Sequence, residues 1–428
     1  MKKIAILVFF TVGFFVHVWA CTGLIAGKQA TVDGSVLVTY SADSHTLYGA
    51  LTSSPAADWP KGSMRSIVEW DTNKPLGEIE QVEHTYAVIG NMNEHQLTVV
   101  ESTWGGRPEL VDTTGIIDYG SLMQLALERA KTAREAIKVM TGLVKKYGYY
   151  SSGESFTIAD PNEAWILDLI GKGPGRRGAV WVAVRIPDDC IAGHANYPRI
   201  HKIPMDDKEN CLYSPDVISF AREMGYFDGL NKDFSFARAY SPADFGALRA
   251  CDARVWSFFR KYDSSMDNYL PYVNGESAEP FPLYVKPSRK LSVQDMKEAM
   301  RDHFEDTPFD MTQDVGAGPF KVPYRFRPMS FEVDGKSYCM ERAIATQQTG
   351  FTLVGQMRNW LPDPVGGVLW FGVDDANTCV YIPMYCGITQ VPECFSPENG
   401  SMYDFSWTSA FWIHNWVANM AYARYEPM

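Results

Sequence analysis

The chain has 428 residues, of which 46% are hydrophobic, and its formal net charge is −12. This length and composition allow one large or two ordinary domains with well-filled cores. The excess of acidic residues argues against binding to nucleic acid or to an anionic membrane surface. After the N-terminus, no apolar stretch reaches the roughly 20 residues of a membrane-spanning helix.

The first twenty residues have the pattern of a secretory signal peptide. Two lysines at positions 2–3 precede an apolar run over residues 4–15, and Val-Trp-Ala at positions 18–20 is a sequence that signal peptidase tolerates. Cleavage after this tripeptide would make Cys21 the first residue of the mature chain. We therefore expect residues 1–20 to be removed by signal peptidase and the product to be exported, either periplasmic or secreted.

An N-terminal cysteine would combine a nucleophile and a base on one residue. Its α-amine has a reference pKa of roughly 7.7–8.0, so a fraction of it is neutral near pH 7 and can accept the thiol proton. Two other interpretations of Cys21 stay open. A lipoprotein signal would lead to a lipid-anchored binding protein, although Trp19 is unusual in such a signal, and the cysteine could also be incidental.

The other cysteines and the histidines form no metal-binding motif. Seven cysteines are scattered between positions 190 and 394, and buried thiols with a disulfide or two are the simplest interpretation of them in an exported chain. No C-x-x-C pair, zinc-spaced histidine or H-E-x-x-H sequence occurs. We therefore expect neither a metal nor another cofactor, and the disulfide pattern stays open.

The start of the mature chain is predicted to be a β-hairpin. Residues 22–26 and 36–40 have the composition of strands and flank an Asp-Gly turn. Antiparallel pairing then places Cys21 opposite residues 40–42, with Asp43 within a few ångströms of the chain start. An acidic group there would hold the N-terminal ammonium, although an aspartate also commonly ends a strand.

The rest of the chain alternates between predicted strands and helices. Hairpins are predicted to pair residues 86–90 with 97–101 and residues 156–159 with 164–169. Further strands are predicted at residues 180–186, 191–196, 331–333, 342–348, 368–373 and 380–383. Helices are predicted at residues 121–131, 132–148, 292–304 and 410–425. This pattern favours helices packed on antiparallel sheets in one large domain, residues 21–428.

Several short motifs occur in the order in which a known enzyme family has them. They are Cys21-Thr22, Asp33-Gly34-Ser35, Ser41-Ala42-Asp43-Ser44, Gly90-Asn91-Met92-Asn93-Glu94, Glu101-Ser102-Thr103, Ser155-Phe156-Thr157, Ala195-Asn196, Arg301-Asp302-His303, Thr307-Pro308-Phe309, Leu369-Trp370-Phe371-Gly372 and Ala410-Phe411-Trp412. On these motifs the chain resembles the PepD-type cysteine dipeptidases, a family of the N-terminal-nucleophile (Ntn) hydrolases. The resemblance covers nearly the whole mature chain.

The resemblance implies an α+β fold of four layers, αββα, and cofactor-free hydrolysis of dipeptides through an acyl-enzyme. It implies that Cys21 is the nucleophile and Asp43 the acid beside its amine. It also implies oxyanion donors at Asn93 and Asn196, with Asn91 as an alternative in the same turn as Asn93. A neutral amide suits this role, since one such donor is worth roughly 3–4 kcal/mol of transition-state stabilisation.

The expected substrate is a short peptide with charge at both ends. Glu94 or Glu101 could receive its ammonium group, although a glutamate near a turn is commonly just solvated. In many relatives an arginine stands three residues before the aspartate, and Tyr40 stands there in this chain. Tyr40 lacks the positive charge that would favour a thiolate. Many relatives also have a longer C-terminus, and a homo-oligomer is compatible with the sequence.

The nearest alternative is another Ntn amidase of the penicillin V acylase or bile-salt hydrolase type. Such an enzyme would keep Cys21 and Asp43 but would cleave an acyl amide. The motifs favour the dipeptidase, and a panel of dipeptides against acyl amides would separate the two activities.

Overall fold

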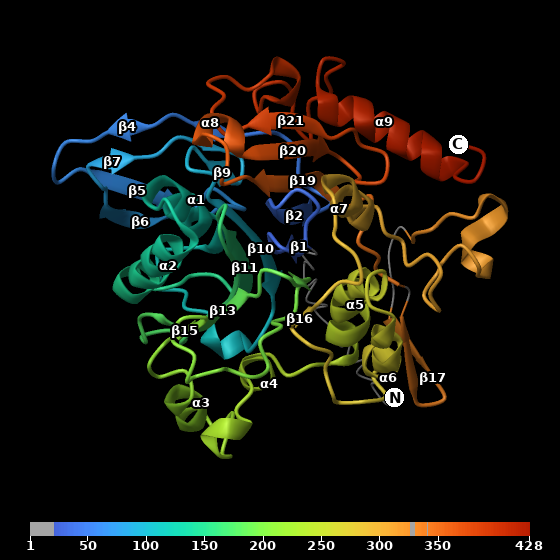
Figure 1. Ribbon diagram of the computed structural model, residues 1–428, viewed down its shortest axis with the longest axis horizontal. Helices are drawn as coiled ribbons and strands as arrows, with labels where there is room; N and C mark the ends of the chain where they lie inside the picture. Colours follow the sequence, from blue (N-terminus) through green and yellow to red (C-terminus); the bar gives the residue numbers. More distant parts are fainter. Residues whose placement is uncertain (1–20, 326–329, 340) are drawn as a thin grey trace, which may run out of the picture.

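The computed structural model describes residues 21–325, 330–339 and 341–428, and the predicted signal peptide lies outside these residues. Strands gather into two large antiparallel sheets, and helices pack on both of them (Figure 1). The protein therefore belongs to the α+β class, as the sequence pattern predicted. No helix among the described residues is long and apolar enough to cross a membrane.

The first sheet has seven strands, and β1, which directly follows Cys21, lies near its centre. Its order is β16-β14-β1-β2-β19-β20-β21. The bounds are β1 Thr22–Ala26, β2 Val36–Asp43, β14 Ile191–His194, β16 Tyr284–Val285, β19 Thr349–Met357, β20 Val368–Val373 and β21 Ile382–Tyr385. Thr22 pairs with Ser41, which confirms the predicted hairpin register. Because β1 is bonded to a neighbour on each side, Cys21 at its start has a fixed position.

The second sheet has eight strands in the order β15-β13-β12-β11-β10-β9-β8-β3. The bounds are β3 Ser53–Ser54, β8 Val88–Ile89, β9 Met92–Asn93, β10 Thr98–Trp104, β11 Gly153–Ala159, β12 Ala164–Gly171, β13 Ala179–Ile186 and β15 Cys211–Tyr213. The predicted pairing of residues 86–90 with 97–101 is wrong, because β9 lies between β8 and β10. Gly90, at φ +51°, lets the chain turn directly after β8.

Three further strand pairs lie outside these sheets: β4 Ala57–Asp58 with β7 His84–Thr85, β5 Met64–Val68 with β6 Pro75–Glu80, and β17 Ser330–Val333 with β18 Lys336–Cys339. The α-helices are α1 Tyr119–Arg129, α2 Ala133–Tyr147, α3 Ser219–Glu223, α4 Phe236–Tyr240, α5 Ala253–Arg260, α6 Leu270–Val273, α7 Val293–Met300, α8 Asp363–Gly366 and α9 Ala410–Ala423. Shorter 3₁₀ or π turns lie at Pro108–Leu110, Asn231–Asp233, Ala247–Asp252, Ser264–Tyr269, Val315–Phe320 and Glu393–Phe395.

The helix ends follow the capping residues in the sequence. Thr132 caps α2 by accepting a hydrogen bond from the Glu135 N–H, and Gly148 ends this helix at φ +80°. Ser292 and Asp295 form a reciprocal capping box at the start of α7. That helix ends at Met300, four residues earlier than predicted, and the chain then turns through left-handed conformations at residues 304 and 306.

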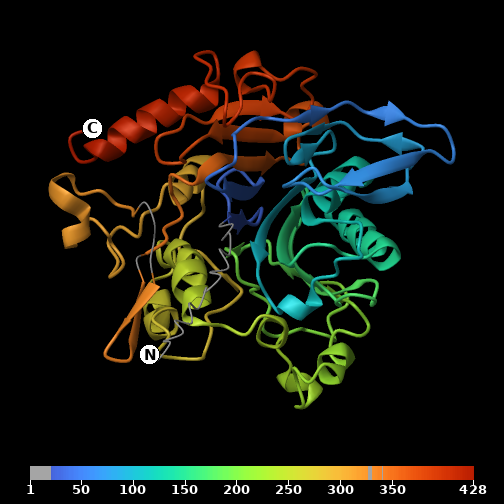
Figure 2. The same cartoon turned by 180° about the vertical axis from the view of Figure 1, so that it is seen from behind.

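The hydrophobic side chains form three clusters. The first fills the space between the two sheets, with Ile25 and Val100 from facing strands. The second lies between the first sheet and α5 and α7, and it includes Leu24. The third lies between the second sheet and α1 and α2, which cover the outer face of that sheet in Figure 2. Leu24 and Ile25 are neighbours in the chain and belong to different clusters, because successive side chains of a strand point to opposite faces.

Two strand predictions near the C-terminus are wrong. Residues 342–348 form no strand, whereas Thr349–Met357, for which no strand was predicted, form β19 between β2 and β20. The segment before β19 instead carries Arg342, which pairs with a buried carboxylate of β2. The ion pair between Arg342 and Asp43 attaches residues 342–348 to β2, and these residues form no strand.

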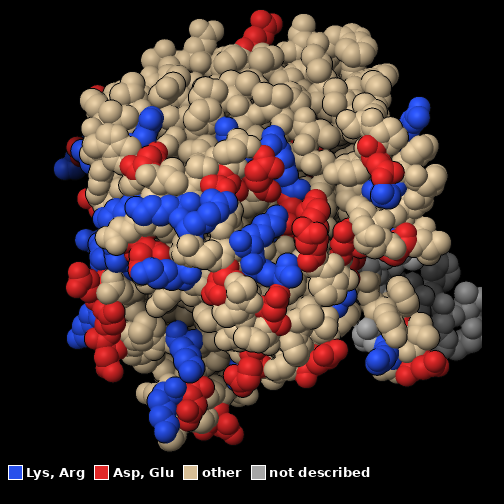
Figure 3. Space-filling view, turned by 45° about the vertical axis from the view of Figure 1, so that its right-hand side comes forward, with Lys and Arg blue, Asp and Glu red and all other residues tan. Residues whose placement is uncertain are grey.

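The C-terminal helix α9 has an apolar surface. It contains no charged residue, and large side chains on it and on the preceding loop are exposed. The upper part of the molecule in Figure 3, where α9 lies, is almost free of lysine, arginine, aspartate and glutamate. The exposed side chains are Tyr403, Phe405, Trp407, Ile413, Trp416, Val417 and Met420.

Candidate active site

Cys21 is buried at the entrance to β1, and its surroundings do not favour a thiolate. Its Sγ lies 3.6 Å from the hydroxyl of Tyr40. Burial raises the pKa of the Cys21 thiol well above its ordinary value, and the carboxylates of Glu101 and Asp43 raise it further. The backbone N–H of Asp43 and the Tyr40 hydroxyl oppose this rise. The thiol therefore needs a base to lose its proton near neutral pH.

Tyr40 connects the thiol to a pair of buried carboxyl groups. Its hydroxyl donates to Glu101 Oε1 at 2.5 Å. Glu101 is in direct contact with Glu154, which is fully buried on the neighbouring strand. Burial, and then the charge of Glu101, raise the pKa of Glu154 well above its ordinary value. At neutral pH we therefore assign the proton of this pair to Glu154 and the negative charge to Glu101.

Asp43 is held by three side chains. Its Oδ2 accepts hydrogen bonds from Ser41 Oγ at 3.0 Å and from Arg342 Nη2 at 2.6 Å. Its Oδ1 accepts from Thr349 Oγ1 at 2.6 Å. The carboxylate is almost fully buried, and the arginine supplies the opposite charge that such burial requires. The predicted proximity of Asp43 to Cys21 is confirmed, since the Asp43 backbone N–H reaches the sulfur.

Arg254 is a site residue that the sequence did not indicate. This arginine lies on α5 and is fully buried. Its Nη1 donates to the Cys21 carbonyl oxygen at 2.9 Å and to Thr22 Oγ1 at 2.7 Å. Its Nη2 donates to Asn196 Oδ1 at 2.8 Å and to the Ala195 carbonyl at 3.2 Å. One guanidinium group therefore joins the start of β1 to the segment that follows β14.

Asn196 is joined to the nucleophile by Arg254, which donates to both residues. Its backbone is left-handed at φ +56°, a conformation that asparagine tolerates better than most residues. Its backbone N–H donates to Ser102 Oγ at 3.1 Å, and its Nδ2 donates to the Thr103 carbonyl at 2.5 Å. An amide nitrogen has two hydrogens, so the second N–H of Asn196 has no protein acceptor among the hydrogen bonds of the described residues.

Asn93 has a different environment, and the predicted oxyanion role does not agree with it. Its Nδ2 donates to the carbonyls of Leu127 and Ala130 at 2.8 and 2.7 Å. Its Oδ1 accepts from the backbone N–H groups of His95 and Leu97. Both amide hydrogens therefore hold the end of α1 against the second sheet. No donor is left for a substrate oxygen.

Glu94 and Asn91 also have structural contacts. Glu94 Oε1 accepts from the backbone N–H of Ala87 at 2.9 Å. Asn91 Nδ2 donates to the Val99 carbonyl at 3.0 Å. The structure therefore brings Cys21, Asp43, Glu101 and Asn196 together and assigns the turn residues Asn91, Asn93 and Glu94 to the support of the second sheet.

His194 joins the two sheets close to the site. Its Nδ1 lies 2.6 Å from Ser102 Oγ and its Nε2 lies 2.9 Å from Thr157 Oγ1, both across the sandwich. Burial, assisted by the charge of Arg254, lowers the pKa of His194 to about 3, so the ring is neutral. A Cβ at Gly23 would lie 2.9 Å from this ring, which explains the glycine at that position.

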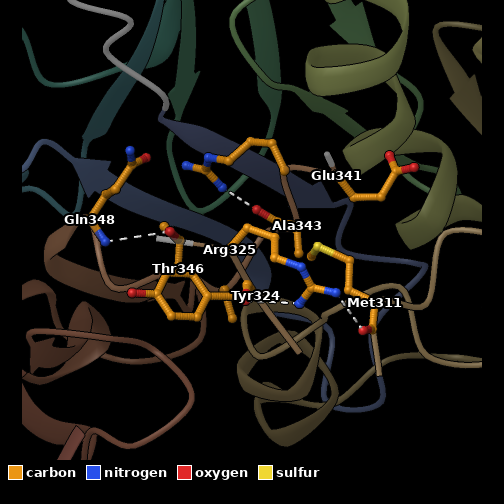
Figure 4. Close-up of a pocket in the computed structure, with 9 residues that line it drawn as sticks. Met311, Tyr324, Arg325, Glu341, Ala343, Thr346 and Gln348 are labelled. Atoms are coloured by element: carbon orange, nitrogen blue, oxygen red, sulfur yellow. Dashed lines mark hydrogen bonds between the residues drawn. The ribbon is translucent and has the colours of Figure 1, made fainter. Parts of the chain in front are cut away.

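Two pockets lie near these residues. The pocket of Figure 4, which Arg342 helps to line, has a volume of about 10 Å³, which is room for about one water molecule. The other has about 330 Å³ and acidic groups in its wall. Its lining residues are Glu69, Asp71, Thr103, Val111, Thr113, Tyr119, Tyr150, Ser151, Ser152 and Glu154. Only the second pocket is large enough for part of a peptide.

Among the described residues, no group of three or more histidine, cysteine, aspartate or glutamate side chains is arranged to hold a metal ion. None of the eight cysteines is joined in a disulfide.

Comparison with known proteins shows the family of this chain. The profile described as "Peptidase family C69" matches residues 20–428. The chain belongs to this family. It is therefore a peptidase, and the family is of the cysteine type.

Three bacterial relatives are 24–27% identical to this chain and cover most of it. A "Probable dipeptidase" of Latilactobacillus sakei is 24% identical over 95% of this chain and 82% of the relative. A "Probable dipeptidase" of Salmonella dublin is 27% identical over 86% of this chain and 81% of the relative. "Dipeptidase A" of Lactobacillus helveticus is 24% identical over 95% of this chain and 82% of the relative.

Proposed function

We propose that this peptidase is an exported dipeptidase in which Cys21, freed as the N-terminal residue, attacks the peptide bond of the substrate. The observation that carries the proposal is the position of Cys21. It enters the centre of a sheet directly after a predicted cleavage site, and its thiol is surrounded by Tyr40, Glu101 and the backbone of Asp43. The names of the relatives support dipeptides as the substrate class.

The proposed fold is the four-layer αββα arrangement of the Ntn hydrolases. The three hydrophobic clusters support it, because they lie between helices and sheet, between sheet and sheet, and between sheet and helices. In that arrangement the nucleophile begins an inner strand, and β1 fits this requirement with a neighbour on each side.

The proposed base is the α-amine of Cys21 itself. The surrounding carboxylates and the burial of the thiol act against a preformed thiolate, so deprotonation must accompany the attack. A neutral α-amine near pH 7 can take this proton directly or through one water molecule. The Asp43 carboxylate, held by Arg342 and Thr349, would then stabilise the ammonium that forms.

The remaining steps follow from the donors around the thiol. The sulfur adds to the peptide carbonyl, and the second Nδ2–H of Asn196 donates to the oxyanion. When the C–N bond breaks, the ammonium of Cys21 returns the proton to the leaving amine. Water then adds to the thioester with the α-amine as base, and the carboxylic acid leaves while the thiol regains its proton. Glu101, which bears the charge of its pair, would receive the ammonium of the substrate.

Replacement of the nucleophile tests this proposal. We expect Cys21→Ala to fold normally and to lose all hydrolysis of a dipeptide panel, whereas Cys394→Ala, at an exposed cysteine, keeps full activity. The panel should include acyl amides, because preference for these over dipeptides would indicate the alternative amidase. Activity of Cys21→Ala at the level of the unmodified enzyme would refute the mechanism.

The mass of the mature N-terminus tests the processing step. A mass that begins at an unmodified Cys21 supports an N-terminal nucleophile. A lipid-sized increment on that residue would contradict it and would indicate a lipid-anchored protein, because acylation removes the basic amine.

A further inference from the structure

We propose that the acidic cavity with Glu154 in its wall binds the cationic side chain of the first residue of the substrate, so that the enzyme prefers dipeptides that begin with lysine or arginine. This inference rests on the proposed dipeptidase function and adds a substrate class to it. The cavity wall has three carboxyl groups, from Glu69, Asp71 and Glu154. Its volume of about 330 Å³ is sufficient for a lysine or arginine side chain.

The carboxyl group of Glu154 is the innermost of these groups. Glu154 is fully buried, and its Oε1 accepts a hydrogen bond from Thr103 Oγ1 at 2.6 Å. Its Oε2 receives no hydrogen bond from any donor among the described residues. Because Glu154 and Glu101 are in contact, the pair keeps one proton unless a counter-charge is present. An ammonium or guanidinium group in the cavity would supply that counter-charge, displace the proton and bind the ionised carboxylates.

The other side of the cavity is more exposed and also acidic. The Asp71 carboxylate accepts from the Tyr119 hydroxyl at 2.8 Å. One lysine is nearby, since Lys74 Nζ donates to the hydroxyl of Tyr150 at 3.0 Å. The acidic groups Glu69 and Asp71 in the wall, with Glu101 and Asp118 nearby, outnumber this lysine. The cavity therefore attracts positive charge.

The distance from the thiol favours a side chain over the α-ammonium as the occupant. The α-nitrogen of a substrate is two bonds from the scissile carbonyl carbon, about 2.5 Å. The path from Cys21 to the cavity runs from Sγ to Tyr40 over 3.6 Å, from Tyr40 to Glu101 over 2.5 Å, and then across the contact with Glu154. A lysine Nζ can lie about 6 Å from its Cα. When Glu101 holds the α-ammonium of the substrate, the lysine side chain is therefore long enough to reach from Glu101 to the cavity at Glu154.

Removal of one carboxylate from the cavity tests the inference. The probes are Lys-Ala, Arg-Ala, Ala-Ala and Glu-Ala, and the variants are Asp71→Asn, Glu154→Gln and, as a control, Asp228→Asn at an exposed site outside the cavity. We expect the unmodified enzyme to cleave Lys-Ala with a kcat/KM about tenfold above that of Ala-Ala. We expect Asp71→Asn to remove most of this difference through KM and to leave Ala-Ala unchanged.

Protonation gives a second readout. Partial removal from water raises the pKa of Asp71 to about 6, and the nearby Asp118 and Glu69 carboxylates add to the rise. A cation binds the ionised carboxylate, so the KM for Lys-Ala should increase as the pH falls through about 6. The KM of the unmodified enzyme for Ala-Ala should not increase in this pH range. The KM of Asp71→Asn for Lys-Ala should not increase there either.

The outcomes separate the two proposals. Equal cleavage of Lys-Ala and Ala-Ala by the unmodified enzyme, or an equal loss on both substrates in Asp71→Asn, would overturn the cationic pocket and leave the dipeptidase intact. Absence of cleavage of every dipeptide by correctly processed enzyme would overturn the dipeptidase proposal itself. If Glu154→Gln fails to fold, the exposed Asp71 still decides the question.

Discussion

Two buried polar clusters lie on opposite faces of the same strand and differ in how completely they are bonded. On one face of β10, Ser102 joins His194 and Thr157, and both ring nitrogens of the histidine have a partner. On the other face, Glu101 contacts Glu154, and the second oxygens of these two carboxyl groups have one shared proton and no other donor among the described residues. Alternation of side chains along a strand separates the two clusters.

The comparison distinguishes structural from functional polar groups. The histidine cluster is uncharged and joins the two sheets, so it stabilises the sandwich and positions the segment of Asn196. The carboxyl cluster contains a charge and shifted pKa values, and it connects the nucleophile to an acidic cavity. Buried groups that lack partners and have perturbed pKa values concentrate at functional sites.

The largest expected effect is on stability, from the satisfied cluster. His194→Ala removes a buried ring and leaves the hydroxyls of Ser102 and Thr157 without their partner, at a cost of about 3–5 kcal/mol in the free energy of unfolding. Urea denaturation measures this value. The matched control is His84→Ala, at an exposed histidine on β7, which should change the stability by less than about 0.5 kcal/mol. Equal stability of the two variants would contradict the structural role.

A second prediction concerns two asparagines, one with an unused hydrogen-bond donor and one without. Asn196 has an amide hydrogen to spare, whereas Asn93 uses both. We expect Asn196→Ala to lower kcat by about 10²–10³ with a small change of KM. We expect Asn93→Ala to lower stability by about 1–3 kcal/mol with an unchanged kcat for the folded fraction. Steady-state kinetics beside thermal melts measure both, and a reversed pattern would restore Asn93 as an oxyanion donor.

The smallest expected effect is a pH dependence of opposite sign in the two clusters. His194 has a folded pKa of about 3, below the unfolded value of about 6.5. Its contribution to stability is therefore complete above the unfolded value and is lost as the pH falls between the two. Glu154 has a raised pKa, so its contribution is complete below the unfolded value of about 4.3 and is lost as the pH rises.

Unfolding of His194→Gln and Glu154→Gln across pH 4–8 isolates these contributions. The advantage of the unmodified protein over His194→Gln should shrink as the pH falls. Relative to Glu154→Gln, the free energy of unfolding of the unmodified protein should decrease as the pH rises. Parallel curves for all three proteins would mean that neither group titrates as its burial indicates.

Local sequence information determined much of the fold near the nucleophile. The alternation of β1 and β2 and the turn between them were sufficient to predict the register that places Asp43 beside Cys21, and Thr132 and Ser292 marked the starts of two helices. These features depend on neighbours within a few residues, or on one turn, so composition and spacing carry them. Glu101 was a sequence candidate for the substrate ammonium, whereas the sequence did not indicate its buried partner Glu154.

The tertiary structure alone decided which residues complete the site. Arg342 is 299 positions from Asp43, and Arg254 is 233 positions from Cys21. No local pattern distinguishes such an arginine from a solvated one. Asn93 also occurs in a motif, yet the packing of α1 on the second sheet takes both of its amide hydrogens. Sequence spacing determines what lies along one strand or hairpin. Only the closure of the chain decides which distant side chain satisfies a buried charge, because that depends on which surfaces pack together.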